Sequence, residues 1–286
     1  MNRNHFLWRA VMAQTKFQLK RGGAVFAFYA LLALVLMNFL GNVIAWQGSD
    51  VIHMIQPMKL LLLSYNMDYF RADLLLVLIQ WYPLLVSVPA GLSLARERQT
   101  GEDVLMAARL GNLYYRLSKL LSAFFTAMIV FSVPFLIEIA LNCLAFPLDA
   151  QGDLSNLGFY DQQYTNMVRN YLFSDLFLRS PYLYAIVGTL LFGMVSGLLS
   201  MLAVAVSSVV KVKFRVLLLL PVFLFLNISV YLSGLAENGF SIRWYDYILL
   251  FDDAPKSLAF YAVAVVIVFA GVLVGAIWGG NRDCIP

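Results

Sequence analysis

Six stretches of this chain are long, apolar and free of charged side chains, and they limit the folds that are open to it. They cover Gly22–Ser49, Leu74–Ala95, Leu120–Ile137, Ser180–Val210, Val216–Ala236 and Ser257–Asn281. A run of about 18 or more apolar residues forms a helix long enough to cross a bilayer. With 62% hydrophobic and 13% charged residues, the chain is also far more apolar than an ordinary soluble domain. The sequence therefore predicts an all-α membrane protein.

The chain is expected to form one transmembrane domain over 1–286, because no polar segment is long enough to bury a core of its own. An interfacial helix is expected over 5–20, a cytoplasmic coupling loop over 96–117, and outer loops over 147–180 and 235–256. The six transmembrane helices are expected at about 22–46, 72–95, 118–146, 181–210, 215–234 and 257–280. Pro83 and Pro89 are expected to bend the second of them.

The distribution of Lys and Arg predicts the orientation. Six spans place both termini on one side, and assigning that side to the cytoplasm collects 14 of the 20 basic residues there. Cytoplasmic loops carry such an excess. The expectation is a multi-pass plasma-membrane protein with both termini in the cytoplasm. The net charge of +4 follows from this asymmetry and does not indicate a nucleic-acid partner.

The segment 5–20 precedes the first span and has the pattern of an amphipathic helix. Its apolar positions recur at helical spacing and are Leu7, Trp8, Val11, Met12, Thr15 and Leu19. Arg9, Lys16 and Lys20 gather on another face. Such a helix would lie in the membrane interface, with the basic side chains toward anionic lipid headgroups and Trp8 as an anchor. The alternative is a basic flank that only orients the first span.

The loop between spans two and three holds the densest charge in the middle of the chain, starting at Arg96–Asp103. Thr100 can cap a helix that begins near Gly101 and ends at Gly111. Glu102 and Asp103 suit its positively polarised first turn. Its apolar face would consist of Val104, Leu105, Ala107 and Ala108. A short helix of this kind predicts a docking site for a soluble partner, and the alternative is a solvated loop.

Several kinds of chemistry are missing from the sequence. None of the seven lysines follows a glycine, so the phosphate-binding loop of ATPases is absent. The two histidines, His5 and His53, fall on opposite sides of the predicted membrane, which argues against a zinc or serine–histidine site. Cys143 and Cys284 also face opposite compartments. The chain is therefore not expected to be an enzyme.

Among the charges inside the apolar runs the one candidate is Glu138, 19 residues after Lys119, and it is peripheral. That separation is roughly 28 Å along a helix, so Glu138 is expected near the outer boundary, facing an outer vestibule or headgroups. Ion-coupled carriers place ionisable groups nearer the bilayer centre. The energy for any transport is thus expected to enter through the 96–117 loop.

Glycines four residues apart mark two of the spans. They are Gly193 and Gly197 in the fourth, and Gly271, Gly275 and Gly279 in the sixth. Small residues at this spacing let helices approach closely. Packing within the subunit is the favoured interpretation, and a dimer seam is the alternative.

These features together resemble the permease subunit of type-2 ATP-binding cassette (ABC) exporters. The specific part covers residues 94–121 and consists of Glu97-x-x-x-Gly101-Glu102 with Lys119 at the start of the third span. Where such permeases often have a proline, this chain has Ala107–Arg109. The resemblance implies two permease chains, identical or different, with two copies of an ATP-binding subunit that hold ATP and Mg. It implies that the ATPase-coupling residues are Glu97, Arg98, Gly101, Glu102, Asp103, Leu105 and Arg109.

The expected function is that of a permease subunit that exports an amphipathic or hydrophobic substrate, such as a peptide, a lipid or a drug-like molecule. This chain would hold no cofactor or metal, and its partners would be the ATP-binding subunit, a second permease chain and membrane lipids. One alternative is an ion-coupled carrier or channel. Another is a non-transporting membrane scaffold or immunity protein that uses the charged loop only for binding.

Overall fold

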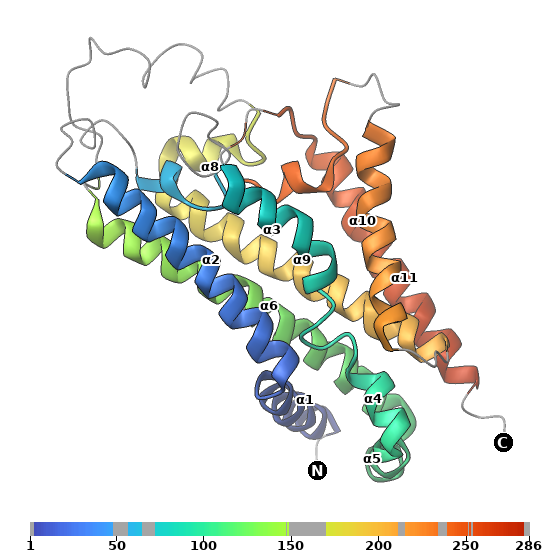
Figure 1. Ribbon diagram of the computed structural model, residues 1–286. Coiled ribbons are helices and arrows are strands. Elements are labelled where there is room, and N and C mark those ends of the chain that lie inside the picture. Colours follow the sequence, from blue (N-terminus) through green and yellow to red (C-terminus); the bar gives the residue numbers. More distant parts are fainter. Residues whose placement is uncertain are drawn as a thin grey trace.

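The computed structural model describes residues 3–47, 57–64, 72–146, 148, 170–210, 215–233, 239–250, 252 and 254–282. Within these ranges the chain consists of helices and turns, without a β-strand, and the all-α prediction is confirmed. The α-helices, seen in Figure 1, are α1 (Arg3–Leu19), α2 (Gly22–Trp46), α3 (Ala72–Leu85), α4 (Ser93–Thr100), α5 (Glu102–Leu110), α6 (Asn112–Ala145), α8 (Ser174–Arg179), α9 (Pro181–Val209), α10 (Leu220–Ser233) and α11 (Leu258–Arg282). Three short 3₁₀ helices are η2 (Pro57–Leu60), η4 (Arg215–Leu219) and η5 (Trp244–Tyr247).

Five helical segments of the described chain are long and apolar enough to cross a membrane. They are α2, α6, α9, the continuous η4–α10 segment and α11. The predicted second span, 72–95, is not one continuous helix. Helix α3 has 14 residues, or roughly 21 Å, against a hydrocarbon core of about 30 Å. Turns follow it until α4 begins at Ser93, and Pro83 and Pro89 explain the interruption because proline cannot donate a backbone hydrogen bond.

Helices α6 and α9 form the centre of the bundle, with α2 against α6 and α11 against α9. The glycines allow this close approach. A Cβ atom at Gly193 or Gly197 would lie 1.8 or 2.6 Å from the nearest atom of α6, and one at Gly275 would lie 2.8 Å from α9. Packing within the subunit is confirmed for these three positions. A Cβ atom at Gly271 would lie 3.1 Å from the Leu202 side chain of α9. The side-chain surroundings of Gly279 are outside the described part.

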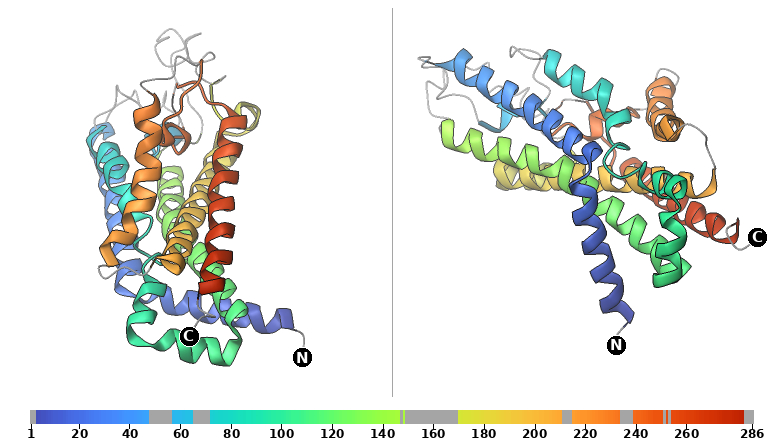
Figure 2. Two further views of the ribbon diagram at one scale, coloured as in Figure 1. Left: turned by 90° about the vertical axis from the view of Figure 1, so that its right-hand side faces the viewer. Right: turned by 60° about the horizontal axis from the view of Figure 1, so that its bottom comes forward.

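The predicted inner elements gather at one end of the bundle, which we term the α1 end. Helix α1 lies across this end, while α4 and α5 project from it (Figure 2). The last turn of α11 points to the same end. The two ends of the described chain therefore lie on one side of the bundle.

The opposite end of the bundle is covered by segments between the helices. Between α2 and α3, Leu60–Leu63 are buried, and the Leu63 carbonyl accepts a hydrogen bond from the Leu250 amide at 2.8 Å. This segment thus packs against the connection between α10 and α11. Most of the predicted outer loop 147–180 lies outside the described residues.

Candidate functional site

Glu97 on α4 is the centre of a buried cluster at the α1 end. Its carboxylate accepts a hydrogen bond from Lys119 Nζ, and the two form an ion pair whose side chains are 6% and 4% exposed. Tyr115 donates its hydroxyl to the other carboxylate oxygen, Oε2, at 2.7 Å. Arg21 Nη2 lies 3.5 Å from Oε1, the oxygen that Lys119 contacts. One carboxylate therefore joins α4 to α6 and to the junction between α1 and α2.

The register of α4 brings Glu97 to the inside. Leu94, one turn earlier, is also buried, and residues three apart share a helix face. Desolvating a carboxylate and an ammonium is expensive, and removing one partner of such a pair leaves an uncompensated buried charge. The cluster (Arg21, Glu97, Tyr115 and Lys119) therefore fixes the position of α4 against α6.

Arg98 makes the second attachment of α4, to the end of α9. Its Nη1 donates to the Ser207 carbonyl at 2.8 Å and its Nη2 to the Ser208 carbonyl at 3.2 Å. The last carbonyls of a helix lack partners within the helix and attract a positive charge. Glu97 and Arg98, both on α4, thus contact different helices of the same subunit, α6 and α9 respectively.

Helix α5 is bracketed by two glycines with positive φ angles, Gly101 at 73° and Gly111 at 80°. The Gly101 amide donates to the Glu97 carbonyl and ends α4 in the left-handed conformation. The prediction that Thr100 caps α5 is wrong. Its hydroxyl donates back to the Glu97 carbonyl at 3.1 Å, because the chain stays helical up to Thr100.

The outward side of α5 combines apolar and charged side chains. Leu105 is 65% and Val104 67% exposed, and Glu102 and Arg109 are exposed beside them. Asp103 is half-buried. Ala108 is exposed, whereas Ala107 packs against the bundle together with Met106. The predicted apolar face is therefore divided, with two large apolar side chains left facing outward.

Helix α1 meets α6 through a polar seam that the sequence patterns did not predict. Gln18 is fully buried, donates to Ser122 at 3.1 Å and accepts from Thr126 at 3.0 Å. The spacing of Ser118, Ser122 and Thr126 on α6 was the available signal, since residues four apart form one row on a helix.

The predicted interfacial residues of α1 lie mostly outside this seam. Trp8 is 52% exposed and has Phe125 as a tilted ring neighbour at 6.1 Å. Arg9, Lys16 and Lys20 are exposed. The exposed surface of α1 therefore carries both an aromatic side chain and three basic side chains.

Glu138 does not face a vestibule or headgroups, and that expectation is wrong. It is 1% exposed and accepts hydrogen bonds from Asn38 Nδ2 at 2.7 Å and from the Leu62 amide at 2.8 Å. The reason is that η2 and the residues after it fold over the end of α6 that lies away from α1. Asn38 and Asn42 both donate to the Leu60 carbonyl and hold this segment in place.

No group of three or more His, Cys, Asp or Glu side chains within the described residues could hold a metal ion. In comparisons with known proteins, no family model, no curated protein and no solved structure matches this chain. The case for a function therefore depends on the geometry of the chain itself.

Proposed function

We propose that this chain is the transmembrane permease subunit of an ATP-driven exporter of the ABC type. It would act with two copies of a separate ATP-binding subunit and with a second permease chain. The observation that supports this most directly is the attachment of α4 and α5. A projecting helix with two large exposed apolar side chains is joined to the central helices by the buried cluster around Glu97.

In this proposal the α1 end faces the cytoplasm of a plasma-membrane protein with six crossings. Helix α3 and the turns after it make the short second crossing, α1 lies in the inner interface, and α5 is the coupling helix. Arg9, Lys16 and Lys20 then lie where anionic headgroups attract them. Trp8 suits the level of the headgroups, where amphipathic rings concentrate.

The coupling residues divide into two kinds. Val104, Leu105 and the exposed charges Glu102 and Arg109 would contact the ATPase, with Asp103 and Gly101 shaping the first turn of α5. Glu97 and Arg98 would act as positioning residues. A displacement of α5 would pass through Glu97 to α6 and through Arg98 to α9, because these contacts are short and buried or partly buried. ATP and Mg would be bound by the partner.

The experiment places a photo-crosslinking amino acid at position 105 or, as a control, at position 144. Leu144 is another exposed leucine, near the opposite end of α6. Crosslinking in native membranes at position 105 alone, to a protein with a phosphate-binding loop, is the expected result. The purified complex should then lose most of its transport with Glu97→Ala. An ATPase captured equally from both positions, or none from position 105, would overturn the proposal.

Buried Glu138 favours one rival, an ion-coupled carrier. No basic side chain in the described part of the chain pairs with it, and buried carboxylates in spans serve ion coupling in carriers. Its position near the outer end of α6 favours a structural role instead. Glu138→Gln keeps an acceptor for Asn38 and Leu62. If transport persists in Glu138→Gln and requires ATP, the ion-coupled carrier is excluded. Transport that disappears with it and needs no ATPase excludes the exporter.

A further inference from the structure

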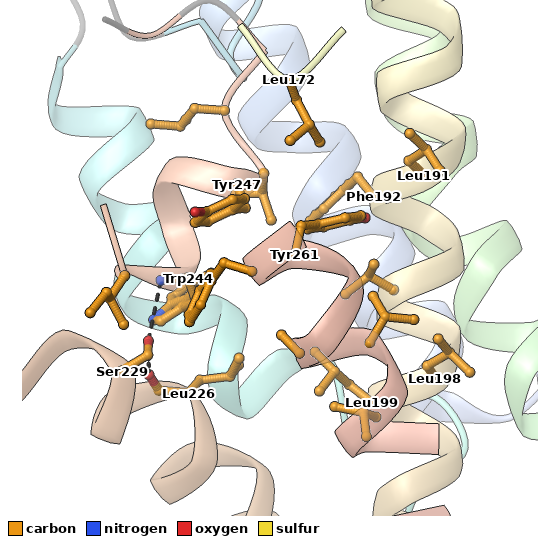
Figure 3. A pocket seen from close by; sticks show the side chains of 18 of the residues that line it. Leu172, Leu191, Phe192, Leu198, Leu199, Leu226, Ser229, Trp244, Tyr247 and Tyr261 are labelled. Atoms are coloured by element: carbon orange, nitrogen blue, oxygen red, sulfur yellow. Dashed lines mark hydrogen bonds between the residues drawn. The ribbon is translucent and has the colours of Figure 1, made fainter. Parts of the chain in front are cut away.

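A cavity of about 320 Å³ lies between α9, α10, α11 and η5, in the half of the bundle away from α1 (Figure 3). None of the described residues that line it is charged. Aromatic rings contribute much of the wall, from Tyr82, Phe192, Trp244, Tyr247 and Tyr261. An apolar cavity of about 150 Å³ is large enough to bind benzene. This one therefore has room for a considerably larger apolar group.

Most polar groups of the lining are already hydrogen-bonded within the protein. The Ser229 hydroxyl accepts from the Trp244 amide at 3.2 Å and donates to the Leu226 carbonyl at 2.7 Å, as drawn in Figure 3. The hydroxyls of Tyr82, Tyr184 and Tyr247 bond to Ser196, Leu250 and Ser241. The Tyr261 hydroxyl forms no hydrogen bond with any described residue. This hydroxyl can therefore serve as a polar contact for a ligand.

The rim of the cavity is apolar and faces the side of the bundle. Four side chains line the cavity and are also about half exposed, Ile228 and Leu232 on α10 and Val263 and Ile267 on α11. Helix α10 packs on α3 and α9, and α11 packs on α9, so the opening lies between α10 and α11. These two helices are membrane-spanning candidates. A molecule that reaches the cavity between them comes from the bilayer.

We propose that this cavity binds a neutral lipophilic molecule with a single hydrogen-bonding group, which enters from the bilayer between α10 and α11. The ligand is neutral because an ionised group buried without a partner is strongly unfavourable, and the lining residues that the structure describes offer no countercharge. The single polar group meets the Tyr261 hydroxyl. The site does not depend on the proposed ATPase partner, so it is tested on this chain alone.

The test uses the full chain in lipid nanodiscs and a long-chain fatty alcohol that carries a diazirine. Ala264 lines the cavity, whereas Ala262 is exposed on the same helix and does not line it. Labelling should fall on peptides of α9, α10 and α11. In Ala264→Phe it should decrease about fivefold or more, because the phenyl ring fills cavity space that the ligand would occupy. Ala262→Phe should leave it unchanged.

Equal labelling in the two variants, or labelling restricted to residues outside the cavity, would overturn the proposal. Thermal unfolding of both variants checks the fold. If Ala264→Phe does not fold, Leu232→Trp replaces it, since the larger side chain narrows the opening from the α10 side. The same decrease in labelling is then expected. Tyr261→Phe gives an independent measurement, since it should weaken labelling by the alcohol but not by the corresponding diazirine alkane. Equal loss for both probes would refute the role of the hydroxyl.

The ligand could be a resident lipid or the exported cargo, and a further arm of the experiment distinguishes the two. Labelling of the assembled ATPase complex is compared with and without ATP. Labelling that decreases with ATP identifies cargo, and labelling that does not change identifies a resident lipid. Both outcomes support the site itself.

Discussion

Lys119 and Glu97 are 22 residues apart in the sequence and form an ion pair in which both side chains are more than nine-tenths buried. They belong to α6 and α4, so this contact sets how the projecting α4–α5 segment meets the central helices. Breaking it should therefore loosen a whole segment, not a single side chain.

Replacing Glu97 by Ala should destabilise the packing of α4 by about 3–5 kcal/mol, because it removes the buried ion-pair partner of Lys119. Amide hydrogen exchange in Ser93–Leu110 should rise, while exchange in the middle of α9 should change little. The double variant Glu97→Ala with Lys119→Met should recover part of the loss. Glu102→Ala is the control, since Glu102 is exposed. Equal exchange in the Glu97 and Glu102 variants would contradict the structural role of the pair.

The α1–α6 seam leads to a second prediction. Gln18→Ala removes the hydrogen bonds to Ser122 and Thr126, which should cost about 1–3 kcal/mol for the buried polar groups left behind. Hydrogen exchange in Arg3–Leu19 should increase. Lys16 lies on the exposed side of the same helix, so Lys16→Ala should not have this effect. If the two variants behave alike, the seam does not hold α1 in place.

The sequence predicted the helices well because their signal is local. Apolar runs bounded by charges such as Arg21 mark a bilayer-long helix whatever it packs against. The burial of Gln18 and Glu138 could not be predicted in this way, because it depends on which distant segment covers them. Thr100 shows the same limit at short range. A threonine before a charged turn suits a helix N-cap. In the structure, however, Thr100 is the last residue of α4, and its hydroxyl donates to the Glu97 carbonyl within that helix.

The site was predictable in position but not in organisation. The charged pattern placed a helix between two glycines, where α5 is found. It did not show that Glu97 faces Lys119, since this requires α4 to fold back on α6 after the break at Pro89. The division of the apolar face has the same cause, because Ala107 meets the bundle and Leu105 does not.

The contact between α6 and α9 yields a third prediction, in which two effects have opposite signs. Gly→Ala within a helix is normally stabilising by about 0.5–1 kcal/mol. At Gly197, however, a Cβ would lie 2.9 Å from the backbone oxygen of Phe124, so overpacking should dominate and destabilise by about 1–3 kcal/mol. Gly22→Ala is the control, because no atom beyond its chain neighbours and the nearby backbone of its own helix lies within 4 Å of the position that its Cβ would take. A higher unfolding temperature for Gly197→Ala would show that the helices are less closely packed.

Leu105 provides the most direct test of what α5 does. Its side chain is 65% exposed, so Leu105→Asp should leave the unfolding temperature of the isolated chain nearly unchanged. If α5 docks an ATPase, the same change places a charge in an apolar contact and should weaken the complex about tenfold or more, which corresponds to about 1.4 kcal/mol. Affinity is measured by titrating the purified ATPase against the chain in nanodiscs. Leu144→Asp changes a leucine that is even more exposed, at 84%, and far from α5, so it should not affect binding. Unchanged affinity in Leu105→Asp would remove α5 from the interface, even if the ATPase binds elsewhere.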